Sequence, residues 1–278
     1  VALVPARLRG WLDVSARVAK IPTHRLRLRE PLRRGQAAAA EGGVKRTLVA
    51  STRAAVRGAQ TLSLAASDSV VTAGDPTHVV ATIQGEGAQR SAGATLYGPF
   101  ATAGEAGCDA PIVGTVSATV SAEGTYHLTP VAPGAGGYHV WGVTVSGTET
   151  SVAASACAAT VRVRARTSVA VSAPAQAPPG NVNVTVSVSG IPFQGPVGLG
   201  VTVYGPYTSP AQRTADLCNQ VDSSTTLQRV GDGAIVSGPI PLAGPGRYYA
   251  LRAQASPGEL WLGSSSPCLA TGSLIDVP

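Results

Sequence analysis

The feature that most constrains how this chain can fold is an internal duplication. Four landmarks recur in the same order, at offsets of 107, 110, 110 and 111 residues. They are Thr95–Phe100 and Thr202–Tyr207, Cys108 and Cys218, Gly136–His139 and Gly246–Tyr249, and Cys157 and Cys268. Self-similarity at one spacing indicates tandem copies of a single structural unit. We therefore predict two homologous units at 61–165 and 166–278, preceded by a separate segment at 1–60.

Within each unit, Val alternates with Thr or Ser at the period of a β-strand. The clearest stretches lie at 79–83, 113–120, 138–145 and 182–188. Turn residues separate them, as in Gly74-Asp75-Pro76 and Gly244-Pro245-Gly246. The chain also has 33 Gly and 21 Pro among 278 residues, which suits many short strands joined by turns. The fold class expected is all-β, with two tandem Ig-like antiparallel β-sandwiches after the N-terminal segment.

The four cysteines allow three disulfide connectivities, and their spacing does not choose among these. The duplication does, because each unit holds one pair, Cys108 with Cys157 and Cys218 with Cys268. Each bond would close a loop of about 50 residues and stabilise the fold by about 4 kcal/mol in the chain-entropy model. Because disulfides persist outside the reducing cytoplasm, we expect an extracellular or cell-surface location. The alternative is four buried free thiols.

Charge is divided unevenly along the chain. Residues 1–60 hold thirteen Lys or Arg and three Asp or Glu, a net charge of +10, whereas residues 61–278 hold eight and twelve, a net charge of −4. A basic arm joined to an acidic body suggests that the arm meets something negative, such as an envelope polymer or the body of a neighbouring copy. The arginines expected to mediate assembly are Arg25, Arg27, Arg29, Arg33 and Arg34. The alternative is a solvated linker.

Two local patterns occur within the arm. Residues 24–29 (HRLRLR) alternate with a period of two, so they favour an extended strand that needs a partner sheet. Residues 43–60 place Val44, Leu48 and Ala55 at helical spacing, which predicts a short helix.

The motif order of the first unit resembles that of a known group of proteins. The residues concerned are Leu96–Phe100 (LYGPF), Cys108, Gly124–Tyr126 (GTY), Gly137–Trp141 (GYHVW) and Cys157. This order looks like the disulfide-bearing Ig-like repeats of actinobacterial cell-surface proteins, over about 61–278 and more weakly in the second unit. The resemblance implies a surface-displayed array of structural or adhesive type, and it brings no catalytic residues. In the immunoglobulin pattern the core Trp comes shortly after the first Cys. This chain departs from that pattern, because Trp141 lies 33 residues after Cys108 and the equivalent residue of the second unit is Leu251.

No group of side chains points to catalysis. Both lysines, Lys20 and Lys45, lie in the arm, so a Lys–Asn isopeptide bond cannot form within either unit. His127 and His139 could face one another across a sheet, but a zinc site takes three or four ligands, and we interpret both as strand-surface histidines. The sequence shows no nucleophile elbow, phosphate loop or carboxylate pair. We expect no enzyme activity, no cofactor and no metal site.

The repeated aromatic motif has two interpretations. Tyr97, Phe100, Tyr204 and Tyr207 could lie on loops that contact a partner, since aromatic residues dominate interface anchors. They could instead cover the end of each sandwich at a proline-fixed turn. We favour the second interpretation, because a chain with 7 Tyr, 3 Trp and 2 Phe needs most of them in its cores.

These observations lead to one functional hypothesis and its rivals. We expect a non-enzymatic extracellular structural subunit of a surface assembly or filament, whose sandwiches project and whose arm mediates self-association or envelope attachment. The rivals are an adhesin that binds a host protein or carbohydrate through loops at 97–108 and 204–218, and a phage virion decoration or tail protein. Nucleic acid is not an expected partner, because an oxidised body argues against access to DNA. No window holds the ~18 uninterrupted apolar residues of a transmembrane segment.

Overall fold

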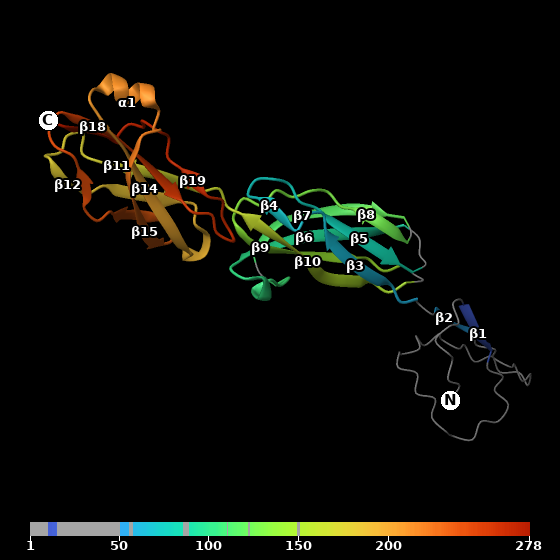
Figure 1. Ribbon diagram of the computed structural model, residues 1–278. Coiled ribbons are helices and arrows are strands. Elements are labelled where there is room, and N and C mark those ends of the chain that lie inside the picture. Colours follow the sequence, from blue (N-terminus) through green and yellow to red (C-terminus); the bar gives the residue numbers. More distant parts are fainter. Residues whose placement is uncertain are drawn as a thin grey trace, which may run out of the picture.

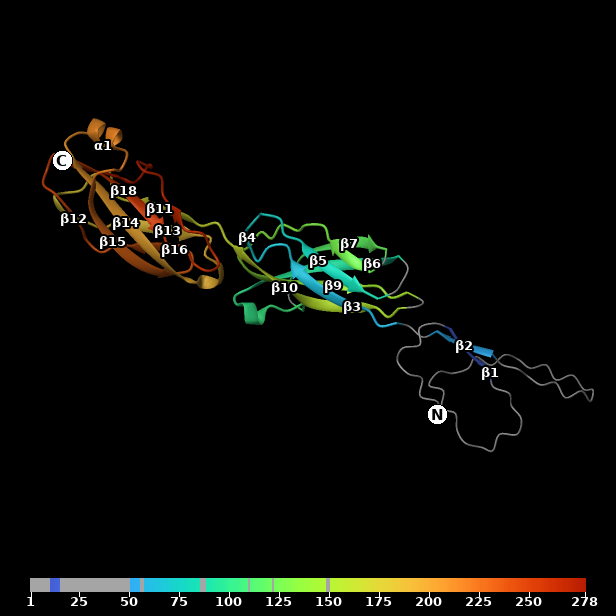
Figure 2. The same ribbon diagram turned by 45° about the vertical axis from the view of Figure 1, so that its right-hand side comes forward.

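Two β-sandwiches lie end to end in the chain (Figures 1 and 2). The computed structural model describes residues 58–85, 89–109, 111–121, 123–148 and 151–278, and the backbone of two further strands, β1 (Trp11–Ser15) and β2 (Ser51–Ala55). Over these residues nearly every regular element is a β-strand. The all-β class predicted from the sequence is therefore confirmed.

The first sandwich consists of a three-stranded and a five-stranded sheet. Their strand orders are β3–β5–β8 and β4–β10–β9–β6–β7. The strands are β3 (Thr61–Ala66), β4 (Val70–Thr72), β5 (Val79–Gln84), β6 (Arg90–Phe100), β7 (Ile112–Val120), β8 (Gly124–His127), β9 (Gly137–Val145) and β10 (Ala154–Arg164). A 3₁₀ turn, η1 (Ala103–Glu105), follows β6. Neighbouring strands are antiparallel except for β4, which runs parallel to β10.

The second sandwich repeats this plan. Its sheets are β11–β13–β16 and β15–β14–β18–β19, with β20 also paired to β18, and a short ladder joins β12 to β17. The strands are β11 (Ser168–Ser172), β12 (Gly180–Val182), β13 (Thr185–Ser189), β14 (Pro196–Tyr207), β15 (Val221–Val230), β16 (Gly233–Val236), β17 (Ile240–Leu242), β18 (Arg247–Ala255), β19 (Ser264–Ser265) and β20 (Leu274–Val277). The helices are the 3₁₀ turn η2 (Pro192–Gln194) and the α-helix α1 (Pro210–Asp216).

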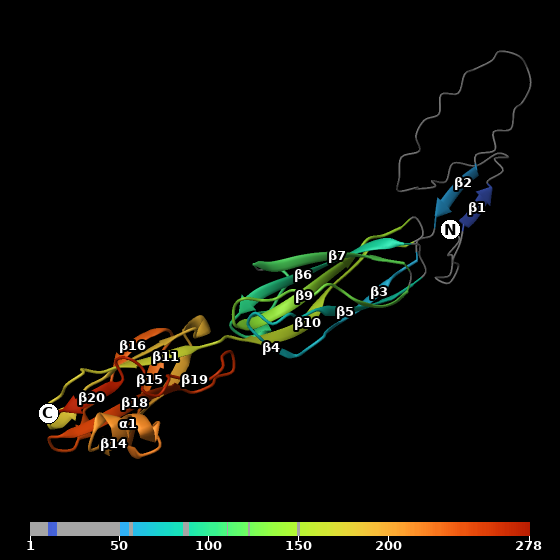
Figure 3. The same ribbon diagram turned by 90° about the horizontal axis from the view of Figure 1, so that it is seen from above.

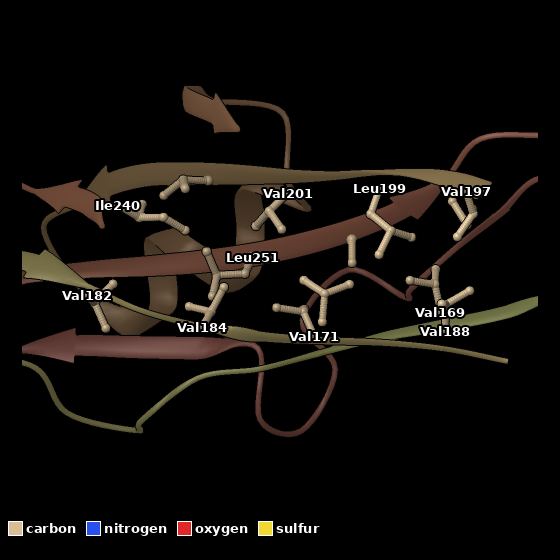
Figure 4. Close-up of a cluster of buried hydrophobic side chains, with 14 of the residues drawn as sticks. Val169, Val171, Val182, Val184, Val188, Val197, Leu199, Val201, Ile240 and Leu251 are labelled. Carbon is tan, nitrogen blue, oxygen red and sulfur yellow. The ribbon is translucent and has the colours of Figure 1, made fainter. Parts of the chain in front are cut away.

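Each sandwich has its own apolar core, built by the alternation seen in the sequence. In β9 and β18, which occupy equivalent places, burial follows nearly the same pattern along nine residues. The fully buried Trp141 of β9 corresponds to the fully buried Leu251 of β18. Figure 4 shows Leu251 among inward-facing Val and Leu side chains of both sheets of the second sandwich. Burial of each such side chain contributes about 1.5–3 kcal/mol, so period-two patterning alone accounts for both cores.

Two local predictions are corrected. Residues 51–55 form β2, paired antiparallel with β1, where a short helix was expected within 43–60. Pairing with residues 36 to 44 positions earlier supplies the backbone hydrogen bonds that a short isolated helix in water would not hold. The single strand predicted at 182–188 is divided into β12 and β13, which pair with different strands. The strand predicted at 24–29 lies outside the described residues.

Candidate functional site at the junction of the two sandwiches

The connection between the sandwiches is short and hydrogen-bonded. Three residues, 165–167, separate β10 from β11. The Ala165 N–H donates to the carbonyl of Leu260 at 2.8 Å, and the Leu262 N–H donates to the carbonyl of Ala165 at 2.9 Å. The Thr167 hydroxyl donates to the Leu262 carbonyl at 2.6 Å. The connection is therefore fixed to a loop of the second sandwich and is not a free tether.

Side chains of the first sandwich reach the same loop. The Arg164 guanidinium, at the end of β10, donates from Nη2 to the carbonyls of Gly258 at 3.3 Å and Trp261 at 3.1 Å. The Glu259 carboxylate accepts a hydrogen bond from the Tyr138 hydroxyl and lies 3.8 Å from the Arg162 guanidinium. This hydrogen bond raises the pKa of Tyr138 above its ordinary value. Tyr138 of β9 and Arg162 and Arg164 of β10 thus all contact the loop at 258–261 of the second sandwich.

The loop itself is held in shape by Trp261. Its indole is 8% exposed and donates from Nε1 to the Ser256 carbonyl at 3.0 Å. A Cβ placed on Gly258 would lie 2.2 Å from this ring, so only glycine permits the close approach of the loop backbone to the indole. The carbonyls that Arg164 binds are therefore presented by a loop packed on its own aromatic side chain.

An open cavity of about 560 Å³ lies at the junction. Both sandwiches line it with small or apolar residues, among them Gly74, Pro99 and Ala135 from the first and Ile191 and Phe193 from the second, and Arg166 of the link also lines it. Phe193 is 46% exposed, and its ring would lie 3.0 Å from a Cβ on Gly137 of the first sandwich. The cavity is thus bounded by a contact across the junction.

Both predicted cysteine pairs are bonded in the structure. Cys108 joins Cys157 with their Cα atoms 6.0 Å apart, and Cys218 joins Cys268 at 6.1 Å. Each bond ties the segment after a long central strand, β6 or β14, to the last part of the same sandwich. This is the pairing that the duplication predicts.

The repeated aromatic motifs lie in strands and do not form free loops. Tyr97 and Phe100 belong to β6 and are half-buried, and Tyr204 and Tyr207 belong to β14 and are buried. The peptides Gly98–Pro99 and Gly205–Pro206 are cis. The Tyr207 hydroxyl donates to the Asp216 carboxylate at 2.6 Å. In the second sandwich these aromatic rings are part of the packing, as in the interpretation favoured from the sequence, and they do not form an exposed contact there.

His127 and His139 do not face one another. His127 lies on β8 and His139 on β9, in different sheets. His127 instead faces His78, with 3.2 Å between Nδ1 of the former and Nε2 of the latter. His139 is fully buried, so its interpretation as a strand-surface histidine is wrong, and burial lowers its pKa. Among the described residues no group of three or more His, Cys, Asp or Glu is placed to hold a metal ion.

The five assembly arginines, Arg25, Arg27, Arg29, Arg33 and Arg34, lie outside the described residues. Within the part of the chain that the structure does describe, none of the helices has the length and apolar character needed to cross a membrane. Sequence reasoning missed the junction residues Arg164, Tyr138 and Glu259. One signal was available, because the link at 165–167 is short and contains neither glycine nor proline.

Comparison with known proteins identifies no family. No family model and no curated protein matches the chain. Among solved structures, a DUF4785 family protein from Legionella pneumophila is 12% identical with a TM-score of 0.33, over 75% of this chain and 55% of its own. The adhesin InvE of Yersinia pseudotuberculosis is 18% identical with a TM-score of 0.28, over 74% and 57%. Red sea bream transglutaminase is 14% identical with a TM-score of 0.26, over 79% and 31%. These similarities are too low to bear on function.

Proposed function

We propose that this chain is a non-enzymatic structural protein that works outside the cytoplasm. Its two sandwiches act as one stiff projecting rod, and its basic arm holds the rod in a multimeric assembly or on an anionic envelope surface. The junction carries this proposal. Domains joined only by a flexible linker move relative to one another by default. Here backbone pairing at Ala165 and the side chains of Arg164 and Tyr138 oppose that motion.

The two disulfides support the location. Such bonds persist in oxidising compartments and are rare in the cytosol. They close loops with sequence separations of 49 and 50 residues, so each constrains a large part of its sandwich. A protein that projects from a surface gains from such constraint, since it receives no help from cytoplasmic chaperones.

The charge division supports the role of the arm. A net charge of +10 on residues 1–60 and −4 on residues 61–278 lets the arm of one copy attract the body of another. The same charge would attract an acidic envelope polymer. Both contacts are electrostatic and weaken as added salt shortens the Debye length.

Assembly is tested on the full chain by sedimentation velocity and negative-stain electron microscopy. One variant replaces Arg25, Arg27, Arg29, Arg33 and Arg34 by Gln, and a matched control replaces the same five by Lys. We expect the wild type and the Lys variant to form multimers or to cosediment with an anionic polymer such as polyglutamate, and the Gln variant to lose both properties. A wild-type chain that stays monomeric at high concentration and does not cosediment with the polymer would overturn the proposal.

The same variants separate this role from that of an adhesin. An adhesin that binds through its sandwiches would keep its binding to host-cell surfaces when the arm is neutralised. A structural subunit attached through its arm would lose its attachment in the Gln variant and keep it in the Lys variant.

A further inference from the structure

One strand of the first sandwich lies at an unpaired sheet edge. β7 ends the strand order of the five-stranded sheet, where Figure 3 shows it beyond β6. It pairs with β6 on one side, and among the described residues no other strand pairs with it. The backbone hydrogen bonds between described residues outside the ladders involve none of residues 112–120. In such a strand every second residue directs its N–H and C=O groups away from the sheet.

β7 lacks the charged and proline residues that usually protect an edge, and its ladder with β6 is irregular only at Val113, near its start. Its sequence, IVGTVSATV, contains neither a charged residue nor a proline. Ile112 at its start is 62% exposed. Proteins commonly block long edges with lysine, proline or inward-pointing charge, because an unprotected edge is a template for another strand. The regular part of β7, residues 114–120, therefore presents a template without electrostatic protection.

The equivalent edge of the second sandwich differs. β15 contains Asp222 and Arg229. The Arg229 guanidinium donates to the carbonyls of Asp232 at 2.6 Å and Ala234 at 2.7 Å, so it is held against its own loop. Of these two equivalent edge strands, β7 is the one without charged residues.

The sequence of β7 is complementary to itself. In an antiparallel pair of β7 strands centred on Val116, the regular part of the strand meets like with like. Gly114 faces Ala118, Thr115 faces Ser117, and Val116 faces Val116 of the other copy. Cross-strand pairs of these kinds are favourable. In a two-fold dimer the same surface of both copies meets, so charges of one sign on that surface would repel each other. Because β7 carries no charge, its pairing does not incur this repulsion.

We propose that β7 is a self-pairing edge, through which two copies of this chain join their five-stranded sheets into one continuous sheet. The pairing is antiparallel strand addition, in which main-chain hydrogen bonds give affinity and the facing side chains fix the register. This inference deepens the proposed structural role and rests on it for its use in an assembly. It supplies a side-to-side contact between rods that is separate from the arm.

The test uses the full chain with the five arm arginines replaced by Gln, so that assembly through the arm is removed. In this background, Thr115→Lys with Ser117→Lys sets two new lysines opposite each other at two places in the pair. Thr115→Lys with Ser117→Asp sets opposite charges at the same places. Ser224→Lys with Thr226→Lys makes a matched change at exposed positions of β15.

Sedimentation velocity over a concentration series gives the dissociation constant of the pair. We expect the parent chain and the β15 variant to dimerise alike. The double-lysine variant should dissociate at least about tenfold more readily, because two favourable cross-strand pairs become repulsive, and the Lys/Asp variant should regain the dimer. Hydrogen exchange should show dimer-dependent protection of residues 112–120.

Three outcomes would overturn the inference while leaving the role of the arm standing. One is a parent chain that remains monomeric at millimolar concentration. Another is a double-lysine variant that pairs as well as the parent. The third is protection of β7 only when the native arm arginines are present, which would assign the edge to the arm of a neighbouring copy.

Discussion

At the scale of single residues, Gly142 shows how closely the first disulfide is packed. Gly142 faces Cys157 in the ladder between β9 and β10. A Cβ placed on it would lie 2.8 Å from Sγ of Cys108 and 3.0 Å from the ring of Tyr97. The sulfur cannot withdraw because it is bonded to Cys157. Glycine is therefore required here by close approach of the disulfide.

Replacing this glycine should destabilise the first sandwich. Gly142→Ala should lower the free energy of unfolding by about 1–3 kcal/mol, as expected for overpacking in a well-filled core. Urea denaturation followed by circular dichroism measures it. Gly93→Ala is the control, because its Cβ would meet only the Thr144 hydroxyl at 3.4 Å, an ordinary contact. The penalty of Gly142→Ala should shrink in a Cys108→Ala background, and an unchanged penalty there would contradict the explanation.

The pair formed by Tyr207 and Asp216 predicts a dependence of stability on pH. Burial, followed by the nearby Asp216 carboxylate, raises the pKa of Tyr207 above its usual range. The hydrogen bond from Tyr207 is the main cause that lowers the pKa of Asp216. A depressed carboxyl pKa stabilises the fold above the unfolded value of about 3.9, and this contribution is lost as pH falls through the folded value.

We therefore expect the difference in melting temperature between the wild type and Tyr207→Phe to be larger at pH 7 than below pH 3. Thermal melts at a series of pH values measure it. Asp216→Asn should make the difference nearly independent of pH. A difference of equal size at every pH would show that the hydroxyl acts only as a neutral partner.

At the scale of elements, α1 is too short to be stable alone and depends on its anchors. Ser209 caps it by accepting a hydrogen bond from the Gln212 N–H at 3.2 Å. The buried Arg213 donates to the Asp276 carboxylate at 2.7 Å and to the carbonyls of Tyr249 and Ile275 at 3.3 and 3.4 Å. One guanidinium thus fixes α1 to both β18 and β20.

Removing this guanidinium should loosen α1. Arg213→Met should reduce the stability of the second sandwich by about 1–3 kcal/mol, below the cost for a fully buried pair because the Asp276 side chain is 41% exposed. Chemical denaturation gives the loss, and hydrogen exchange should show faster exchange in 210–216. Arg252→Met, which removes bonds only to Ser265 and Ser266, is the control and should cost less.

Some elements were predicted correctly from the sequence and others were not. Residues 138–145 and 113–120 were predicted within one residue of β9 and β7, because local alternation there matches the period of a half-buried strand. The helix α1 was missed although Ser209-Pro210 is an N-terminal helix signal. The strand β2 was assigned to a helix because its partner β1 is distant in sequence. The contact of Arg164 with Trp261 spans 97 residues, so the short link at 165–167 could indicate a fixed junction but could not identify the residues that form it.

At the scale of the whole molecule, the contacts at the junction limit how far the two sandwiches can move relative to one another. Arg164→Gln combined with Glu259→Gln removes the charged contacts to the loop at 258–261. Small-angle scattering should then show a broader distribution of lengths and a lower mean maximum dimension. Arg166→Gln is the control, because its pair with Asp75 is 3.5 Å long and exposed on both sides. An unchanged scattering profile in the double variant would assign the stiffness to the uncharged contacts, such as the backbone pairing at Ala165.

The end-to-end arrangement has a mechanical consequence. A load applied between the start of β3 and the end of β20 passes through both sandwiches in series, since these points lie at opposite ends of the described rod (Figure 1). The disulfides span sequence separations of 49 and 50 residues, and each withholds roughly 170 Å of extensible chain from that load. Under tension an oxidised molecule would yield much less length than a reduced one. The redox state of the four cysteines thus sets the maximum length to which the two sandwiches can be extended under load.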